Sequence, residues 1–361
     1  MSSNHYQQRL QETRVAAKII EIVQSLANQI NCQLKENGGK GLVSDSHFPN
    51  HRDWQVPQDV FQYRLDKIVL LCNIAKRIFS EEERVVKVSG PTVIFGDLHG
   101  NLADVLLYER LFWPRIPDLV LDNVVFLGDY VDRGLQSLEV FLYILALKVM
   151  DPHKFTVLRG NHETRQMHVQ FSFRKECLAK FGRDLGQEVW LLLNEVMDSI
   201  PFCAVVNDTI FCAHGGIPTS AKTIRELNMI SNDLPSPESE APPVWEIMWN
   251  DPATQAQIEE GRGSLGNIST QKGFMPNIKR GAGFFYSEVA VDRFLKDNGL
   301  THVIRAHEMK RQGFSFHFDG KVVTVFSCSF YSGLQNTAAV MRVEDNKIIP
   351  IQIKTMNQED Y

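Results

Sequence analysis

The sequence contains no long apolar run and few cysteines. No stretch of about 18 apolar residues occurs and no charged-then-apolar signal opens the chain, so we expect neither membrane insertion nor secretion. The six cysteines include no C-x-x-C pair, a pattern typical of reduced, buried thiols in a cytoplasmic or nuclear protein. The net charge of −5 argues against a broad nucleic-acid-binding face.

The remaining composition is that of an ordinary globular protein, with 43% hydrophobic and 22% charged residues among 361. Apolar residues at three- and four-residue steps predict helices over 6–34 and 61–79, with a polar stretch rich in turn residues between them. We predict an N-terminal helix and linker over 1–59, a main domain over 60–350 and a short tail over 351–361. We favour packing of the first helix on its own domain; the alternative is docking of a regulatory subunit or scaffold.

Three short motifs follow predicted strands and precede predicted helices. They read GDLHG at 96–100, GDYVDRG at 128–134 and RGNHE at 159–163, and each comes after a short apolar run. The aspartate or asparagine of successive motifs is 32 residues apart, which suits one strand-helix repeat. Ligands bind at the carboxyl edge of such sheets, so we expect the three motifs to form one rim.

The two halves of the chain show different patterns. Strand-helix units run from 92 to about 199 and end in a helical stretch over 163–198, which we expect to break near Gly182 and Gly186. Hairpin signals dominate the later half, such as the Asp-Gly pair at 319–320 between two apolar strands. The chain is therefore predicted to form a mixed α/β fold in which parallel strands meet antiparallel ones.

The motif residues form a set suited to two metal ions. Four residues of these motifs and two histidines from farther along the chain offer oxygen or nitrogen ligands: Asp97, His99, Asp129, Asn161, His214 and His307. Asp129 would bridge both ions, because a carboxylate has two oxygens. Asp97 and His99 would complete one ion, and the other three residues would complete the second. Mixed nitrogen and oxygen ligands suit Mn, Fe or Zn, and two such ions lower the pKa of a bridging water toward about 7.

Three further motif residues are available for acid-base and phosphate chemistry. Asp132 can hold the imidazole of His162 and raise its basicity, and His162 can then protonate a leaving alkoxide. The guanidinium of Arg133 can bind two phosphate oxygens at once. Any one of these residues alone is more often structural, so the prediction depends on three complete motifs at matched strand ends.

Together with HGG at 214–216 and RAHE at 305–308, the three motifs resemble those of the phosphoprotein phosphatases, a family of metal-dependent serine/threonine phosphatases. The sequences FSFRKEC at 171–177 and KRGAGFFYS at 279–287 are most similar to the corresponding motifs of the calcineurin branch. The resemblance implies a metallophosphoesterase-type fold. In that fold a central β-sandwich of mixed sheets is flanked by helices, and this chain would add an extra N-terminal helix.

The resemblance also implies roles for individual residues. It supports the same six metal ligands and the same acid pair, and it adds Arg280 to Arg133 as a second phosphate clamp. It implies that Tyr331 lines the site from a late loop. This loop departs from the family, which usually reads SAPNY where the present chain has SCSFY at 327–331.

These residues lead to one preferred hypothesis and two alternatives. The chain is predicted to be a protein serine/threonine phosphatase that hydrolyses phosphoserine and phosphothreonine by direct attack of a hydroxide bridging two metal ions. Its partners would be phosphorylated protein substrates, with neither nucleic acid nor membrane involved. The alternatives are a metallophosphoesterase acting on nucleotides or phosphodiesters, and a weakly active scaffold, which only the altered loop at 327–333 favours.

Overall fold

The computed structural model describes residues 3–36, 65–113, 122–254, 257, 273–345 and 347–354. The helices are α1 (Ser3–Glu36), α3 (Leu65–Glu81), α4 (Leu102–Phe112), α5 (Ser137–Met150), α6 (Arg165–Gln170), α7 (Phe173–Phe181), α8 (Arg183–Ser199), α9 (Ile224–Asn228), α10 (Pro237–Glu240), α11 (Pro242–Trp249) and α13 (Glu288–Asn298), with the 3₁₀ turn η3 (Tyr331–Gly333). The strands are β1 (Val85–Val88), β2 (Thr92–Phe95), β3 (Asn123–Phe126), β4 (Phe155–Val157), β5 (Cys203–Val206), β6 (Ile210–Ala213), β7 (Asp251–Pro252), β8 (Phe274–Pro276), β9 (Phe284–Tyr286), β10 (His302–Arg305), β11 (Phe314–His317), β12 (Val322–Val325), β13 (Ala338–Glu344) and β14 (Lys347–Ile353).

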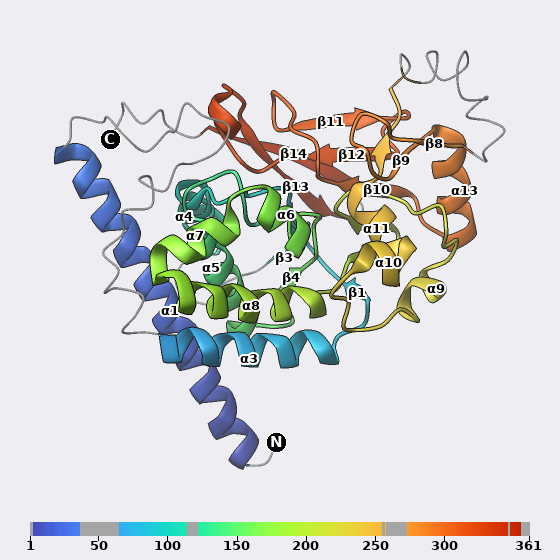
Figure 1. The fold of residues 1–361 in the computed structure, drawn as a ribbon. Coiled ribbons are helices and arrows are strands. Elements are labelled where there is room, and N and C mark those ends of the chain that lie inside the picture. The colour runs from blue at the N-terminus through green and yellow to red at the C-terminus, as the bar shows by residue number, and fades with distance from the viewer. Residues whose placement is uncertain are drawn as a thin grey trace.

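Two large sheets form the centre of the molecule (Figure 1). One has the strand order β1-β5-β6-β10-β12-β11, and the other has the order β14-β13-β2-β3-β4. Parallel pairing joins β2, β3 and β4 in one sheet and β6, β10 and β12 in the other. The predicted hairpins β5-β6, β11-β12 and β13-β14 add antiparallel strands. This arrangement confirms the predicted mixed α/β sandwich.

The alternation of side chains along each strand explains why the sheets need cover on both faces. In β2, Ile94 belongs to the core between the two sheets, while Val93 and Phe95 belong to a core under the helices. In β6, Cys212 lies in the same inner core, while Phe211 belongs to a third core on the other side. Successive side chains of a strand point to opposite faces, so strands that are apolar throughout must be buried on both.

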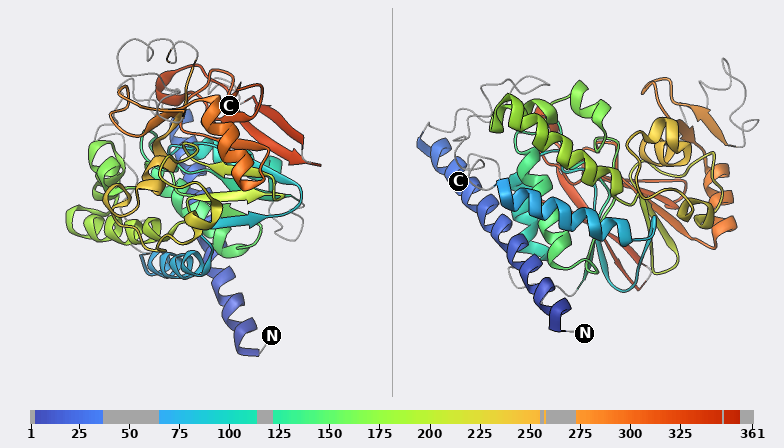
Figure 2. Two further views of the ribbon diagram at one scale, coloured as in Figure 1. Left: turned by 90° about the vertical axis from the view of Figure 1, so that its right-hand side faces the viewer. Right: turned by 60° about the horizontal axis from the view of Figure 1, so that its bottom comes forward.

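Helices cover the outer faces of both sheets (Figure 2). Residues of α1, α3, α4, α5, α7 and α8 share one core with the five-stranded sheet. Residues of α9, α11 and α13 share another core with the six-stranded sheet. The sandwich is therefore closed on both sides, and its open ends are left for the loops that follow the strands.

The N-terminal helix α1 packs on the main domain. One apolar stripe of this helix is buried and shares a core with α3 and α5, and it includes Val15, Ile19, Val23 and Leu26. The opposite stripe is exposed and polar, and it includes Arg14, Lys18 and Glu21. The contacts of the described side chains support packing of α1 on its own domain. A docking role stays a prediction, and the predicted linker before residue 60 lies outside the described residues.

The long helical stretch predicted over 163–198 is three helices. The expected break occurs at Gly182, whose φ is 83°, but a second break at Phe171 and Ser172 was not predicted. Gly186 lies inside α8. The sequence also did not indicate the small third sheet, which has the order β7-β9-β8.

Two predictions from composition can be compared with the described residues. No helix among them is both long and apolar enough to cross a membrane. The five cysteines whose side chains the structure describes are buried and unpaired: Cys72, Cys177, Cys203, Cys212 and Cys328. Burial raises the pKa of the Cys177 thiol well above its usual range, so this thiol is suited to packing and not to nucleophilic chemistry.

His168 in α6 makes the stability of the fold depend on pH. Its ring is fully buried, and Trp190 Nε1 donates a hydrogen bond to its Nδ1 over 3.1 Å. Burial lowers the pKa of His168 to about 4, whereas an unfolded chain would have a pKa of about 6.5. As the pH falls, the unfolded chain binds a proton at His168 before the folded protein does. The contribution of neutral His168 to the free energy of unfolding is therefore complete above pH ~6.5. It is lost as the pH falls toward ~4, by on the order of 3 kcal/mol.

We therefore expect His168→Gln to flatten the decline in the free energy of unfolding between pH ~6.5 and ~4, because glutamine still offers Trp190 an acceptor but does not titrate. Urea denaturation at several pH values measures this effect. His153→Gln, at an exposed position, is the matched control. Parallel pH curves for the His168 variant and the wild type would show that this histidine does not supply the pH dependence.

Candidate metal centre

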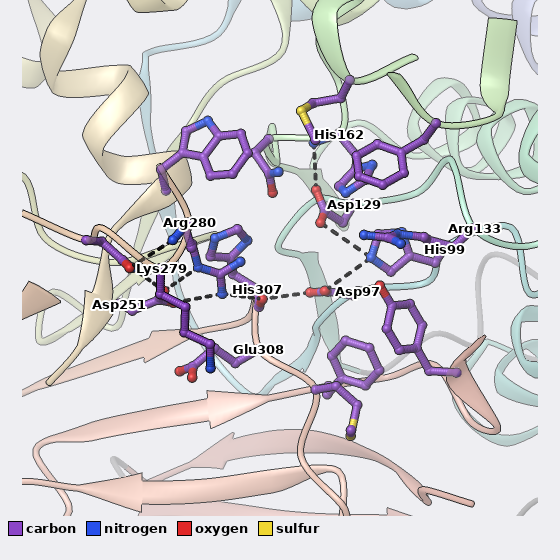
Figure 3. A pocket seen from close by; sticks show the side chains of 18 of the residues that line it. Asp97, His99, Asp129, Arg133, His162, Asp251, Lys279, Arg280, His307 and Glu308 are labelled. Carbon is purple, nitrogen blue, oxygen red and sulfur yellow. Dashed lines mark hydrogen bonds and ion pairs between the residues drawn. The ribbon is translucent and has the colours of Figure 1, made fainter. Parts of the chain in front are cut away.

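The predicted site residues meet at one end of the sandwich, where strands of both sheets stop. The three motifs follow β2, β3 and β4, whose ends are aligned by parallel pairing. In the other sheet, the parallel strands β6 and β10 lead to His214 and His307. The structure brings together all six predicted ligands, each exposed by 8% or less: Asp97, His99, Asp129, Asn161, His214 and His307. They lie in and beneath a pocket of about 530 Å³ (Figure 3).

Five predicted site residues adopt left-handed backbone angles. Their φ values are 41° for His99, 58° for Asp129, 66° for Asp132, 70° for Arg133 and 66° for His307. Residues with side chains rarely adopt such angles, because each costs roughly 1–3 kcal/mol. Strain of this kind persists where the surrounding structure holds it, and it gathers here in the turns that aim side chains into the pocket.

Two glycines let the second and third motifs touch. A Cβ on Gly128 would lie 2.3 Å from the nitrogen of Gly160, and a Cβ on Gly160 would lie 2.4 Å from Asp129 Oδ1. Any other residue would therefore push the two loops apart. The close approach lets the His162 N–H donate to Asp129 Oδ1 over 2.9 Å, which fixes the central carboxylate.

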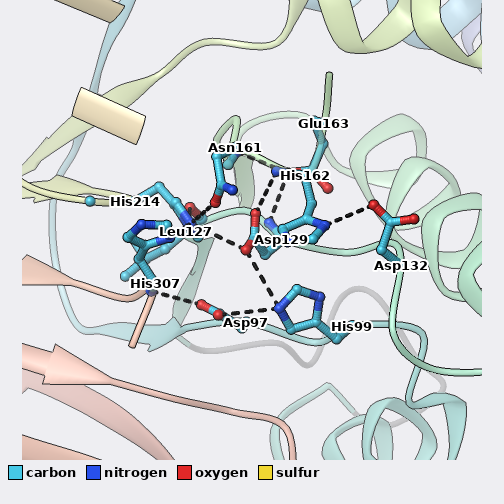
Figure 4. Close-up of polar contacts among 12 residues, drawn as sticks. Asp97, His99, Leu127, Asp129, Asp132, Asn161, His162, Glu163, His214 and His307 are labelled. Atoms are coloured by element: carbon cyan, nitrogen blue, oxygen red, sulfur yellow. Dashed lines mark hydrogen bonds and ion pairs between the residues drawn. The ribbon is translucent and has the colours of Figure 1, made fainter. Parts of the chain in front are cut away.

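Two histidines present a lone pair to the middle of the site (Figure 4). His99 Nδ1 lies 2.9 Å from the carbonyl oxygen of Val131, and His214 Nδ1 lies 3.1 Å from that of Leu127. A carbonyl only accepts, so each Nδ1 carries a proton and each Nε2 points to the centre of the site, where it can bind a cation. These Nε2 atoms lie 3.5 Å and 3.3 Å from Asp129 Oδ2. Lone pairs at such distances repel one another unless a cation lies among them.

Further acceptors converge on the same point. His214 Nε2 lies 2.9 Å from Asn161 Oδ1 and 3.1 Å from His307 Nδ1. His307 Nε2 is buried and has no hydrogen-bond partner in the described part of the chain. If the Asn161 amide is turned, its nitrogen donates to Asp129. In the other orientation, the Asn161 amide oxygen faces the histidine nitrogens and the Asp129 carboxylate, where a bound cation would take the place of the hydrogen bond. The set of ligand atoms therefore fits metal binding.

Asp129 is shared by two groups of ligand atoms. In one group it lies within 4.8 Å of His99 and His162, and in the other within 4.8 Å of His214 and His307. Burial opposes its charge, but the nearby imidazoles, His214 foremost, hold the pKa of Asp129 well below its usual range. The carboxylate is therefore ionised and central, which suits a ligand that bridges two cations.

Asp132 and His162 form a pair beside this centre. His162 Nδ1 lies 2.7 Å from Asp132 Oδ2, while Oδ1 of the same carboxylate accepts from the N–H groups of Ser172 and Phe173. Burial opposes the charge of Asp132, but the contact with His162 lowers its pKa below the usual value. The start of α7 thus fixes Asp132, and Asp132 fixes the ring. Nε2 is the ring atom of His162 that can exchange a proton with a bound group.

Two arginines stand at the pocket walls. The guanidinium of Arg133 lies 4.0 Å from the centre of the Phe171 ring, and its buried Nε has no hydrogen-bond partner among the described residues. Arg280 donates to both carboxylate oxygens of Asp251 and to the carbonyl oxygen of His307. Arg280 is therefore held in place from behind, and Arg133 keeps donors available for an anion.

Tyr331 reaches the pocket from the loop after β12. Its ring centre lies 5.1 Å from that of His99 and 5.1 Å from that of Phe326. Burial raises the pKa of the Tyr331 hydroxyl above its usual value. The hydroxyl therefore stays protonated, and it can donate a hydrogen bond to a group bound in the pocket.

Two acidic residues support the site although no role was predicted for them. Glu163 accepts hydrogen bonds from three backbone N–H groups, including that of Asp129 at 2.8 Å. Asp251 binds both Arg280 and Arg305. The motifs RGNHE and WNDP contain these residues. A sequence pattern does not show which backbone groups a buried carboxylate will accept from.

Comparison with known proteins identifies the family. A family model described as calcineurin-like phosphoesterase matches residues 90–311. The chain belongs to the calcineurin-like phosphoesterase family. The predicted resemblance to metal-dependent phosphatases is thereby confirmed, and this phosphoesterase is a hydrolase.

Named relatives of the phosphoesterase are serine/threonine phosphatases. One, from Schizosaccharomyces pombe, is named as a candidate serine/threonine-protein phosphatase and is 33% identical over 281 residues, which are 78% of this chain and 83% of that protein. The PP2A-like phosphatase PPG1 of Saccharomyces cerevisiae is 33% identical over 261 residues, 72% of this chain and 67% of that protein. A solved S. cerevisiae phosphatase described as similar to human PP5 has a TM-score of 0.68 and 25% identity, over 84% of this chain and 91% of that one.

These relatives confirm the family and the fold, but they do not test every prediction made from the sequence. The two S. cerevisiae proteins are described as PP2A-like and as similar to PP5, so the finer similarity to the calcineurin branch stays a prediction. The roles of individual residues likewise stay predictions. The structure adds the geometry in which those roles can be tested.

Glu163→Gln is expected to weaken metal binding by roughly 10–100-fold, although Glu163 is not a predicted ligand. The amide nitrogen of glutamine would face at least one of the three backbone N–H groups that the carboxylate now binds. The loop that carries Asp129 would then shift. Competition with a chelator, followed by elemental analysis, measures the metal affinity.

Glu83→Gln is the matched control, because Glu83 is exposed and does not line the pocket. Thermal melting of both variants shows whether they are folded. A folded Glu163 variant that holds two metal ions as tightly as the wild type would show that this carboxylate does not support the site.

Proposed function

We propose that this phosphoesterase is a protein serine/threonine phosphatase acting on phosphoserine and phosphothreonine. The observation that carries the proposal is the 2.7 Å contact between Asp132 and His162 at the edge of the ligand cluster around Asp129. Serine and threonine alkoxides are poor leaving groups, so an oriented proton donor at this place suits their phosphate esters. The names of the relatives support the same activity.

We infer that the site holds two Mn, Fe or Zn ions, because its ligands mix carboxylate, amide and imidazole groups. Asp97, His99 and Asp129 would hold one ion. Asp129 would also hold the second ion, together with Asn161 and the two later histidines. When bound, such ions neutralise phosphate charge and lower the pKa of water.

The protein's own groups would perform the remaining steps. Arg133 and Arg280 would bind phosphate oxygens and orient the phosphorus atom, since guanidinium groups match phosphate geometry. His162, oriented by Asp132, would donate its Nε2 proton to the seryl or threonyl oxygen as the bond between that oxygen and phosphorus breaks. The hydroxyl of Tyr331 would donate a hydrogen bond from the loop after β12.

The direct test is hydrolysis of a phosphothreonine peptide by the protein loaded with Mn. We expect turnover that disappears on chelation, and we expect His162→Ala to lower kcat by about 10²–10⁴-fold while the metal content stays unchanged. The same variant should lose far less activity on p-nitrophenyl phosphate, whose phenolate leaves without a proton. Steady-state kinetics and elemental analysis provide these values.

His153→Ala, at an exposed position, is the matched control and should behave as the wild type. Equal losses on the peptide and on p-nitrophenyl phosphate would contradict the role of His162 as proton donor. A folded, metal-loaded wild type that hydrolyses nucleotides or phosphodiesters but no phosphopeptide would overturn the proposed function.

We further propose that the substrates are phosphorylated proteins of the cytoplasm or nucleus. The buried, unpaired cysteines among the described residues support a reducing compartment. A regulatory subunit could bind the exposed polar stripe of α1. Affinity purification from fractionated cells, with Arg14→Glu/Lys18→Glu as the comparison, tests both points; recovery in a secreted fraction or an unchanged set of partners would refute them.

A further inference from the structure

The loop between β12 and β13 holds an aromatic residue in a backbone conformation that aromatic residues rarely adopt. Phe330 has φ 50° and ψ 33°, in the left-handed region, and its side chain is 42% exposed. The family wording SAPNY places asparagine here, and asparagine tolerates this region far better. A strained backbone and a half-exposed apolar ring are both unfavourable for folding. We therefore look for a role of Phe330 in binding and not in core packing.

Hydrogen bonds on both sides make this loop rigid. Ser329 donates its backbone N–H and its hydroxyl to the two oxygens of Asp104, over 2.7 Å and 2.8 Å. Asn336 accepts from the Tyr331 N–H over 2.9 Å and donates to the Cys328 carbonyl over 2.8 Å. Proline, which SAPNY has at the position of Ser329, lacks an N–H group and could not donate this backbone hydrogen bond to Asp104. The backbone at Phe330 is thus held in one conformation, so this part of the loop loses little further backbone entropy on binding.

The loop is also continuous with the site. The next residue, Tyr331, lines the pocket and contacts His99 by ring packing at 5.1 Å. Adjacent Cα atoms are about 3.8 Å apart, and an extended peptide advances about 3.3 Å per residue. Three residues of an extended substrate therefore span about 10 Å, a length comparable with the step from the pocket lining at Tyr331 to the adjacent residue Phe330.

The chemistry of this wall differs from that of the rest of the pocket. Residues 327–335 carry no charge, and Leu334 in the same loop is also 48% exposed. The charged residues Lys279, Arg280 and Glu308 gather on the side of the pocket away from His99 and Arg133 (Figure 3). The loop over 327–335 itself offers apolar contact and no charged group, and the charged residue on its side of the pocket is Arg133.

We propose that Phe330 is a specificity-determining residue, which binds a large apolar side chain of the substrate within about three positions of the phosphorylated serine or threonine. This inference depends on the proposed phosphatase function, because the occupant is the substrate itself. An exposed aromatic ring on a backbone held by hydrogen bonds is the kind of group that contributes most to recognition.

The test uses full-length protein loaded with Mn and a set of phosphothreonine peptides that carry leucine or asparagine at each of the three positions on either side. Each kcat/KM is divided by the value of the same protein on p-nitrophenyl phosphate, which has no flanking residue. For the wild type we expect leucine to be preferred by about tenfold or more at one position or more. Phe330→Asn should reduce that preference to about twofold or less, mainly through a higher KM.

Phe316→Asn is the matched control, because Phe316 in β11 is also about half-exposed, at 50%, but lies outside the loop that carries Tyr331 into the pocket. It should keep the wild-type preference. Thermal melting adds a readout of strain: Phe330→Asn should melt no lower than the wild type, since asparagine adopts φ 50° more readily.

Three kinetic results would overturn the inference alone: no leucine preference in the wild type, an unchanged preference in Phe330→Asn, or an equal loss in Phe316→Asn. A lower melting temperature of Phe330→Asn would assign the ring to folding and would also overturn it. If p-nitrophenyl phosphate is hydrolysed but none of the peptides is, the proposed function fails and the inference fails with it.

Discussion

The structure depends on bringing buried lone pairs from two sheets to one point. Asp97 of the five-stranded sheet accepts a hydrogen bond from the His307 N–H of the six-stranded sheet over 2.9 Å. Near the same place the Gly96 N–H donates to the Ser327 hydroxyl, also over 2.9 Å. The atoms left facing the centre are almost all acceptors, so cations and not further hydrogen bonds must balance them. Closure of the sandwich and binding of metal should therefore stabilise each other.

Helix α7 connects the chemistry to the core. Its first residues hold Asp132, which orients His162. One turn later, Glu176 accepts from backbone N–H groups at the start of α5, and burial raises the pKa of this carboxyl to about 7. Lys180 neutralises it over 2.6 Å. Helix α7 thus positions His162 through Asp132, and buried contacts hold the helix itself in place. This suits a proton donor that must keep one orientation.

The motifs could be predicted from the sequence because each follows an apolar strand, and parallel strands of one sheet end at the same edge. The two distant histidines could be included only through their own short motifs. The bonding of Glu163 and Asp251 could not be predicted, since it depends on which backbone groups come near after folding. The left-handed angles of Asp129 and His307 and the small sheet of β7, β8 and β9 depend on tertiary packing in the same way.

The central claim is that residues from both sheets form one centre for two metal ions around Asp129. Anomalous diffraction from a crystal of the Mn-loaded protein tests this most directly. The account predicts two anomalous peaks that share Asp129, one also bound by Asp97 and His99 and the other by His214 and His307. One peak only, or two peaks without Asp129 between them, would contradict it.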